Sequence, residues 1–384
     1  LELPNNGSIV PSPVALTWIP QGQCSGTYHI QISTSQTFDP IFAEADLASE
    51  SYTFSNGTAG TKYYWRVKTV FGESSSEYAE KHNFTMAGGN LLTIDIQPGW
   101  NIISSSIIVA NPSLETVFAD NLNLISYMRN GAGQIFIPSE MINTIDNWNI
   151  IHGYQLYSTD AFTQIMSGDP VNVATTTIPV SQGWNMVAYL RQTGLAAQNA
   201  LSSLGNTVVI AKNGKGEMYM PAFGINTFEA GTANAQMMIP GRGYQIFTTA
   251  AGTLNYNITP QRISESTSST EPRARFLTVN DTRTGRNASL VFVSQSIADG
   301  TEIGVFNSRN ELVGNGVMNN NRAAITLWGD NELTTKLDGA TEGESLSTKS
   351  YNAATGIVSN VSVADVTDIA TGNTTSALKF ANNG

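Results

Sequence analysis

Two short stretches, PGWNIIS at residues 98–104 and QGWNMVA at residues 182–188, decide how this chain is built. Each places Gly-Trp-Asn directly before alternating apolar residues, which is typical of a β-strand with one buried face. Three further landmarks recur in the same order: NGAGQIFIP (130–138) with NGKGEMYMP (213–221), INT (142–144) with INT (225–227), and GYQLY (153–157) with GYQIF (243–247). Four landmarks in one order indicate an internal duplication.

The spacing of the landmarks shows where the two copies differ. Trp100 and Trp184 are 84 positions apart, the Asn-Gly and INT landmarks are 83 apart, and the GYQ landmarks are 90 apart. The second copy therefore carries a longer loop before its last strand. We expect copy one to span residues 88–170 and copy two to span residues 171–258.

Each copy predicts a compact β module with a short helix. Glycine before tryptophan permits a tight turn, and the tryptophan supplies a large buried anchor. The stretches that follow, NPSLETVFADN (111–121) and LAAQNALSSLG (195–205), predict short helices. An Asn-Gly turn then closes a hairpin in each copy. A strand that begins with Gly-Tyr-Gln completes the module.

The first segment, residues 1–87, predicts a β-sandwich. VALTW (14–18), TYHIQIS (27–33) and YYWRVKTV (63–70) alternate apolar and polar residues, and Gly and Pro separate them. PNNGSIVPSPVALTW, YHIQISTSQTFDPIF and GTKYYWRVKTVFGESS resemble a bacterial fibronectin type III domain of the kind found along secreted proteins. The resemblance implies a spacer or a binding module, and the fold alone does not choose between them.

The last part of the chain predicts a linker and a second sandwich. Residues 259–274 are polar and rich in Ser and Thr, which is typical of an exposed linker. Residues 275–384 contain short strands split by turns, which predict an Ig-like sandwich. The sequence therefore predicts an all-β fold with minor α content, in serial modules.

Two further resemblances bear on location. GWNIIS, NGAGQIFIP and GYQLY resemble repeats in large surface and secreted proteins of Bacteroidetes. DGTEIGVFNSRNELVGNGV and the stretch from AAITLWGD to YNAATG resemble a module near the C-terminus of proteins exported by the type IX secretion system. These resemblances imply an extracellular or outer-surface protein of a bacterium.

The same resemblance, and the start of the chain, lead to an expectation about processing. Proteins exported this way normally carry a further sorting domain, and none is visible after Gly384. We expect the sorting domain to have been cleaved from the protein, to have been left out of this chain, or never to have existed. The chain begins at Leu1 without a signal peptide, so a processed or trimmed chain is expected.

Composition limits the partners. Nineteen Lys and Arg residues stand against 30 Asp and Glu, the net charge is −11, and no basic stripe is present. Nucleic acid is therefore not an expected partner. No stretch approaches the roughly 18 apolar residues that a membrane span needs. Cys24 is the single cysteine, which excludes an intrachain disulfide and a metal site built on several thiolates.

Residues that could carry catalysis are scarce. The histidines, His29, His82 and His152, fall in no metal-binding or nucleophile motif. The NGAG and NGKG stretches lie between strands, as hairpin turns do, and not before a helix where phosphate would bind. We predict that the chain is not an enzyme and has no cofactor other than a candidate calcium ion.

The candidate calcium ligands lie in one acidic turn. GDNELTTKLDGATEGE offers Asp330, Asp338, Glu342 and Glu344, whose hard oxygen atoms suit calcium if the loop folds back on itself. The spacing is not that of an EF-hand. Solvated acidic turns are the alternative.

Aromatic residues allow a structural and a binding interpretation. Matching aromatics in two copies favour core anchors, and sugar-stacking platforms are the alternative. The predicted structural anchors are Trp18, Trp65, Trp100, Trp184, Tyr154 and Tyr244. Trp148 has no tryptophan counterpart in copy two, so it is the candidate for a surface contact with a ligand.

Two functions follow from different classes of protein. In the first, the chain is a non-catalytic structural protein, a self-assembling subunit of a surface filament, sheath or layer, or an adhesin stalk. Its partners would be copies of itself or other surface proteins, because sandwich edges can pair by strand addition. In the second, it is a glycan-binding accessory region of a larger secreted enzyme.

Overall fold

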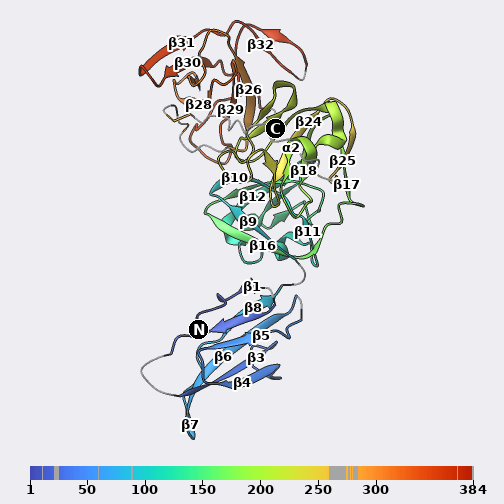
Figure 1. Cartoon of the computed structure of the whole chain (residues 1–384), viewed down its shortest axis with the longest axis vertical. Helices are drawn as coiled ribbons and strands as arrows, with labels where there is room; N and C mark the ends of the chain where they lie inside the picture. The colour runs from blue at the N-terminus through green and yellow to red at the C-terminus, as the bar shows by residue number, and fades with distance from the viewer. Residues whose placement is uncertain are drawn as a thin grey trace.

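The fold is all-β and elongated. The computed structural model describes residues 1–382 except for 11, 21–25, 59, 88–89, 259–273, 276, 278, 280–283 and 370. Cys24 and all but the last residue of the predicted linker lie outside the described residues. Figure 1 shows a sandwich at each end of the long axis with the repeats between them. Among the helices of the described ranges, none has the length and apolar content that a membrane crossing requires.

The N-terminal region forms two facing sheets. One sheet pairs β2 (Val14–Thr17) with β5 (Ser51–Phe54). The other runs β1 (Ser8–Val10), β8 (His82–Met86), β6 (Lys62–Phe71), β3 (Thr27–Ser33) and β4 (Ala43–Leu47), with β7 (Ser74–Ser75) on β6. Trp18 and Trp65 are buried between the sheets, with ring centroids 6.4 Å apart. This arrangement is a fibronectin type III-like sandwich.

The two repeats build sheets of identical strand order. In copy one the order is β10 (Gly99–Ile103), β15 (Tyr154–Ser158), β12 (Ile125–Asn130), β13 (Ile135–Ile137) and β14 (Ile142–Asn143). In copy two it is β18 (Gly183–Ala188), β24 (Gly243–Thr248), β20 (Val208–Lys212), β21 (Met218–Met220) and β22 (Ile225–Asn226). The Asn-Gly hairpins predicted from the sequence are confirmed in both copies.

Smaller elements complete each copy. Copy one adds a sheet of β11 (Ile107–Val109), β16 (Phe162–Pro170) and β9 (Asn90–Ile96). Copy two adds the pairs β17 (Thr177–Val180) with β25 (Gly252–Asn255) and β19 (Leu195–Ala196) with β23 (Met237–Met238). The helices are single turns, α1 (Leu114–Val117) and α2 (Ala197–Ala200), much shorter than the stretches from which they were predicted.

The C-terminal region is a second sandwich. Its sheets are β26 (Asn287–Val293) with β29 (Arg322–Trp328), and β28 (Leu312–Val317), β27 (Glu302–Phe306), β30 (Ser347–Asn352) and β31 (Ile357–Val361) in that order. A small pair, β32 (Val366–Thr367) with β33 (Thr374–Thr375), lies beside them. Val305, Ile325 and Phe380 are among the residues buried in its core.

The two copies pack against each other by a reciprocal exchange. Ile103, at the end of the first GWN strand, forms a backbone bridge with Arg242, which precedes GYQ in copy two. Val187, at the end of the second GWN strand, forms the matching bridge with His152, which precedes GYQ in copy one. Each copy keeps a hydrophobic core of its own, and the two copies contact each other through this pseudo-twofold exchange.

Glycine is required at the centre of this exchange. A Cβ on Gly243 would lie 2.6 Å from the carbonyl oxygen of Ile103, and one on Gly153 would lie 2.8 Å from that of Val187. Both neighbours are backbone atoms of a strand, which cannot rotate away as a side chain can. The glycine of GYQ is therefore a packing residue that lets two strands approach closely.

We expect Gly243→Ala to destabilise the chain by about 1–3 kcal/mol, the usual cost of forcing extra volume into a packed contact. Gly252→Ala is the control, because its added Cβ would first meet the flexible side chain of Leu204, at 3.3 Å. Urea unfolding of the three proteins measures the difference. Equal losses in both variants would contradict the role given to Gly243.

Candidate functional site

The C-terminal sandwich packs against both repeats at a matching pair of tryptophans, Trp100 and Trp184. The Nε1 of Trp100 donates to Oδ1 of Asn331, at 3.1 Å. The guanidinium of Arg129 lies 5.5 Å from the centre of the Trp100 rings. In copy two the Nζ of Lys212 lies 4.4 Å from the centre of the Trp184 rings and donates to the C-terminal sandwich. Each GWN tryptophan therefore has the end of a basic side chain over its face where the C-terminal sandwich packs.

Lys212 is the most strongly perturbed cation among the described residues, and its role is structural. Its side chain is 2% exposed, and its Nζ donates to Oδ1 of Asn287 at 2.8 Å. Burial lowers the pKa of the Lys212 ammonium from 10.5 to about 7. A perturbed lysine is a catalytic candidate only where substrate can reach it, and here the C-terminal sandwich covers it.

Five of the six predicted anchors are buried. Trp18, Trp65, Trp100, Tyr154 and Tyr244 are buried, and Trp184 is half-buried. Burial raises the pKa of Tyr154 to about 12, and a backbone hydrogen bond at Asn149 opposes that shift. These tyrosines therefore stay neutral and act as hydrogen-bonding core residues.

The carboxylates of the acidic turn are hydrogen-bond acceptors within the chain. Asp330 and Asp338 accept backbone N–H groups within the turn, and Glu342 accepts a backbone N–H at 3.0 Å. Burial raises the pKa of Glu344, but hydrogen bonds from a neighbouring serine and threonine lower it to about 2. In the part of the chain that the structure describes, no three acidic, His or Cys side chains converge as metal ligands do. Asp330 and Asp338 stabilise the turn itself, whereas Glu342 and Glu344 also join it to the segments that contain Asn382 and Ser308.

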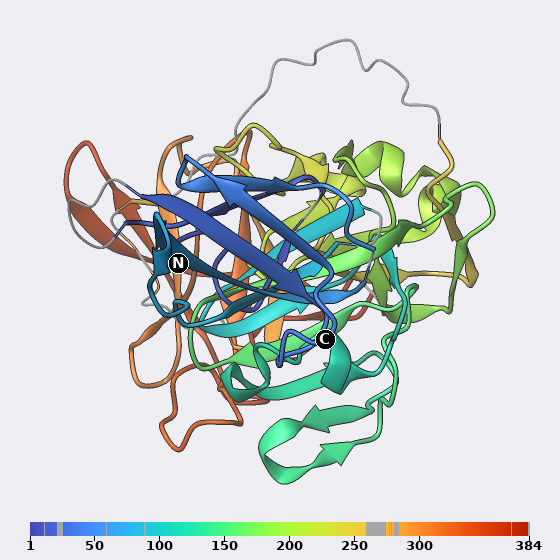
Figure 2. The same ribbon diagram turned by 90° about the horizontal axis from the view of Figure 1, so that it is seen from below.

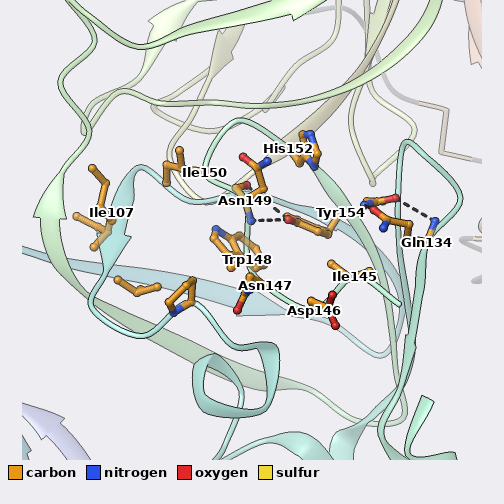
Figure 3. Close-up of a pocket in the computed structure, with 14 residues that line it drawn as sticks. Ile107, Gln134, Ile145, Asp146, Asn147, Trp148, Asn149, Ile150, His152 and Tyr154 are labelled. Carbon is orange, nitrogen blue, oxygen red and sulfur yellow. Dashed lines mark hydrogen bonds between the residues drawn. The ribbon is translucent and has the colours of Figure 1, made fainter. Parts of the chain in front are cut away.

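A cavity of about 570 Å³ opens in copy one, between β11 and the segment that leads into β15 (Figure 3). One side is apolar and includes Ile107 and Ile150. The other carries amides and charged or titratable groups: Gln134, Asp146, Asn147, Asn149 and His152. Mixed linings of this kind are typical of binding sites for small groups.

Trp148 lines this cavity from within the core. Its indole is 5% exposed, and it stacks on Tyr154 with centroids 4.4 Å apart and planes at 29°. Its face is therefore covered, and the expectation that it is a surface platform is wrong. Its Nε1 has no hydrogen-bond partner among the described residues. In the view of Figure 3 that nitrogen lies on the side of Ile107.

The two repeats can be superposed on their tyrosines. The backbone N–H after Trp148 donates to the hydroxyl of Tyr154 at 2.7 Å. The backbone N–H after Met238 donates to the hydroxyl of Tyr244 at 2.9 Å. Trp148 and Met238 therefore occupy equivalent positions.

Copy two has no tryptophan at the position of Trp148, but it has another aromatic residue, Phe228, beside the equivalent tyrosine. Phe228 packs on Tyr244 with centroids 5.2 Å apart, and the equivalent residue in copy one is Ile145. Copy one thus combines Trp148 with Ile145, and copy two combines Met238 with Phe228; all four are buried. The aromatic ring that packs near the tyrosine therefore comes from a different position in each copy.

The comparisons with known proteins show no family. No family model matches the chain, and no curated protein matches it. Among solved structures, the chain is similar to the crystal structure of the FN1–FN3 domains of chicken CNTN1, at 10% identity and a TM-score of 0.20. The likeness covers 42% of this chain and 63% of that structure, so the chain spans less than two thirds of it.

We expect Lys212→Met to change the pH dependence of stability. Between pH about 7 and 10.5 the unfolded chain holds a proton on Lys212 that the folded chain lacks, so the wild type gains stability as pH rises. The Lys212→Met variant lacks this pH-dependent contribution to the free energy of unfolding. Between pH 7 and pH 10 the melting temperature of the wild type should rise relative to that of the variant. Lys62→Met, at an exposed lysine, is the control, and a gap that stays constant with pH would contradict the burial effect.

We expect Trp148→Met alone to cost about 2–4 kcal/mol, since it leaves a void beside Tyr154. Adding Ile145→Phe recreates the pair found in copy two and should recover about half of the loss, because coupled core changes are not additive. Urea unfolding of both single variants and the double variant completes the cycle. Strict additivity would show that the aromatic exchange is not compensatory.

Proposed function

We propose that this chain is a non-catalytic structural protein of a bacterial outer surface that associates with copies of itself. The observation that carries the proposal is the open edge of β31. The strand pairs only with β30, and its other edge has no partner among the described strands. Ile357 and Val358 are 59% and 55% exposed.

β31 lacks the features that protect edge strands in soluble proteins. Natural edges carry lysine, proline or bulges, and the stretch IVSNV has no Lys or Pro and an unbroken register with β30. Main-chain groups on such an edge pair readily with a strand from another chain. This supports strand addition as the mode of association.

The position of the edge leaves it open to another molecule. In Figure 1 the β30–β31 hairpin lies in the part of the molecule farthest from the N-terminal sandwich and points sideways from the long axis. Figure 2, seen from below, shows the blue N-terminal strands in front of the repeats, so the sandwich continues the long axis. A subunit with its contact surface at one end suits a filament, sheath, layer or stalk.

The packing of the C-terminal sandwich against both repeats also supports a structural role. Trp100 and Lys212 tie that sandwich to both repeats, and an apolar cluster shared by Ile210, Val291 and Ala324 continues the contact. Packed contacts of this kind restrict movement between modules. The glycan-binding alternative loses its main support, because the face of Trp148 is covered by Tyr154.

We expect the purified chain to form oligomers or filaments, visible by light scattering and negative-stain microscopy. Val358→Lys should shift it to monomers, because a charged side chain on the edge disfavours pairing with a second strand. Ile41→Lys, at an exposed site outside the strands, is the matched control and should assemble as the wild type does. A wild-type chain that stays monomeric at high concentration would refute self-association.

A further inference from the structure

The two repeats place one carboxylate at the same backbone position. Asp146 and Glu229 each stand two residues after the INT landmark of their copy. Both adopt left-handed backbone, with φ of 63° and 48°, which is uncommon for residues other than glycine. Equivalent position and equivalent backbone make the surroundings of these two carboxylates directly comparable.

In copy two the carboxylate is neutralised by the chain itself. Glu229 is 4% exposed. The Nζ of Lys215 lies 2.5 Å from its Oε2, and the Nε of Arg242 lies 3.7 Å from its Oε1. A buried carboxylate needs such partners, because burial of an unpaired charge is costly.

In copy one both cations are missing. Ala132 stands where copy two has Lys215, and His152 stands where it has Arg242. Burial lowers the pKa of His152, so its ring is neutral at neutral pH. Asp146 is exposed, unlike Glu229, and within the described ranges no ion pair or hydrogen bond reaches its carboxylate, so that only solvent surrounds this charge at the rim. The cavity opens beside it.

From this comparison we infer that the cavity in copy one binds a lysine side chain of a peptide segment from a partner protein. The incoming ammonium takes the place that Lys215 holds in copy two and pairs with Asp146. The methylene stem lies along Ile107 and Ile150, since lysine stems pack on apolar surface. A backbone carbonyl of the segment accepts the unpartnered Nε1–H of Trp148. This site is separate from the β31 edge.

The charge and shape of the cavity favour this occupant over others. The unbalanced charge at its rim is negative, and the chain as a whole carries −11, so an anion is disfavoured. A sugar would need an aromatic face, and the face of Trp148 is occupied by Tyr154. A lysine segment supplies both the cation and the acceptor that the site lacks.

The experiment follows the six indole N–H signals of the ¹⁵N-tryptophan-labelled full chain during titration with Nα-acetyl-lysine methylamide. The Trp148→Phe variant assigns the signal of Trp148. We expect that signal to shift saturably, and we expect no shift with the Nε-acetylated probe or with N-acetylglucosamine. No shift up to tens of millimolar of the lysine probe would refute the proposal. Equal shifts with the neutral probes would also refute it.

Two variants test the role of charge. Asp146→Asn should bind the lysine probe about tenfold more weakly, because it removes a charge-assisted hydrogen bond; asparagine tolerates left-handed backbone, so the fold is kept. Asp160→Asn, at an exposed carboxylate of the same copy, should bind as the wild type does. The double variant Ala132→Lys, His152→Arg rebuilds the cations of copy two and should abolish binding. Unchanged affinity in either the Asp146 variant or the double variant would overturn the proposal.

Discussion

The close approach of each GWN strand to the backbone before the other copy's tyrosine is the contact on which the rest of the molecule depends. It turns a sequence duplication into a pseudo-twofold pair, with Gly153 and Gly243 at the contact points. The same pairing brings Trp100 and Trp184 to one side, where each has the end of a basic side chain over its rings. The C-terminal sandwich packs against this side of the pair of repeats. The strand patterns within each copy do not determine this contact between the copies.

Much of the local structure could be predicted from sequence, because it depends on neighbouring residues. Period-two alternation, Asn-Gly turns and the repeated landmarks predicted the all-β fold and the hairpins. The reciprocal contact was not predictable in the same way. It joins Ile103 to Arg242 through backbone atoms, and a glycine before a tyrosine carries no sign of which strand will lie against it.

The candidate site shows where comparison of repeats misleads and where it helps. Trp148 is exceptional only at its own position, because copy two places an aromatic ring, Phe228, at the position of Ile145. The acidic turn misled for another reason: backbone N–H groups, which occupy its carboxylates, have no letter in the sequence. The charge difference was readable, since NGKG against NGAG and GRGYQ against IHGYQ record the missing cations directly.

Symmetry gives the β31 edge a consequence of its own. If that edge pairs with the same edge of another molecule, the contact is isologous, and association closes at a dimer. If it pairs with a different edge, such as that of β4 at the other end, the contact is heterologous, and growth continues unless the rotation between subunits closes a ring. The pair of repeats is nearly symmetric, but a single C-terminal sandwich lies across it and gives the molecule a direction. A polar building block of this kind has a leading end and a trailing end, so any open-ended assembly would have two chemically distinct tips.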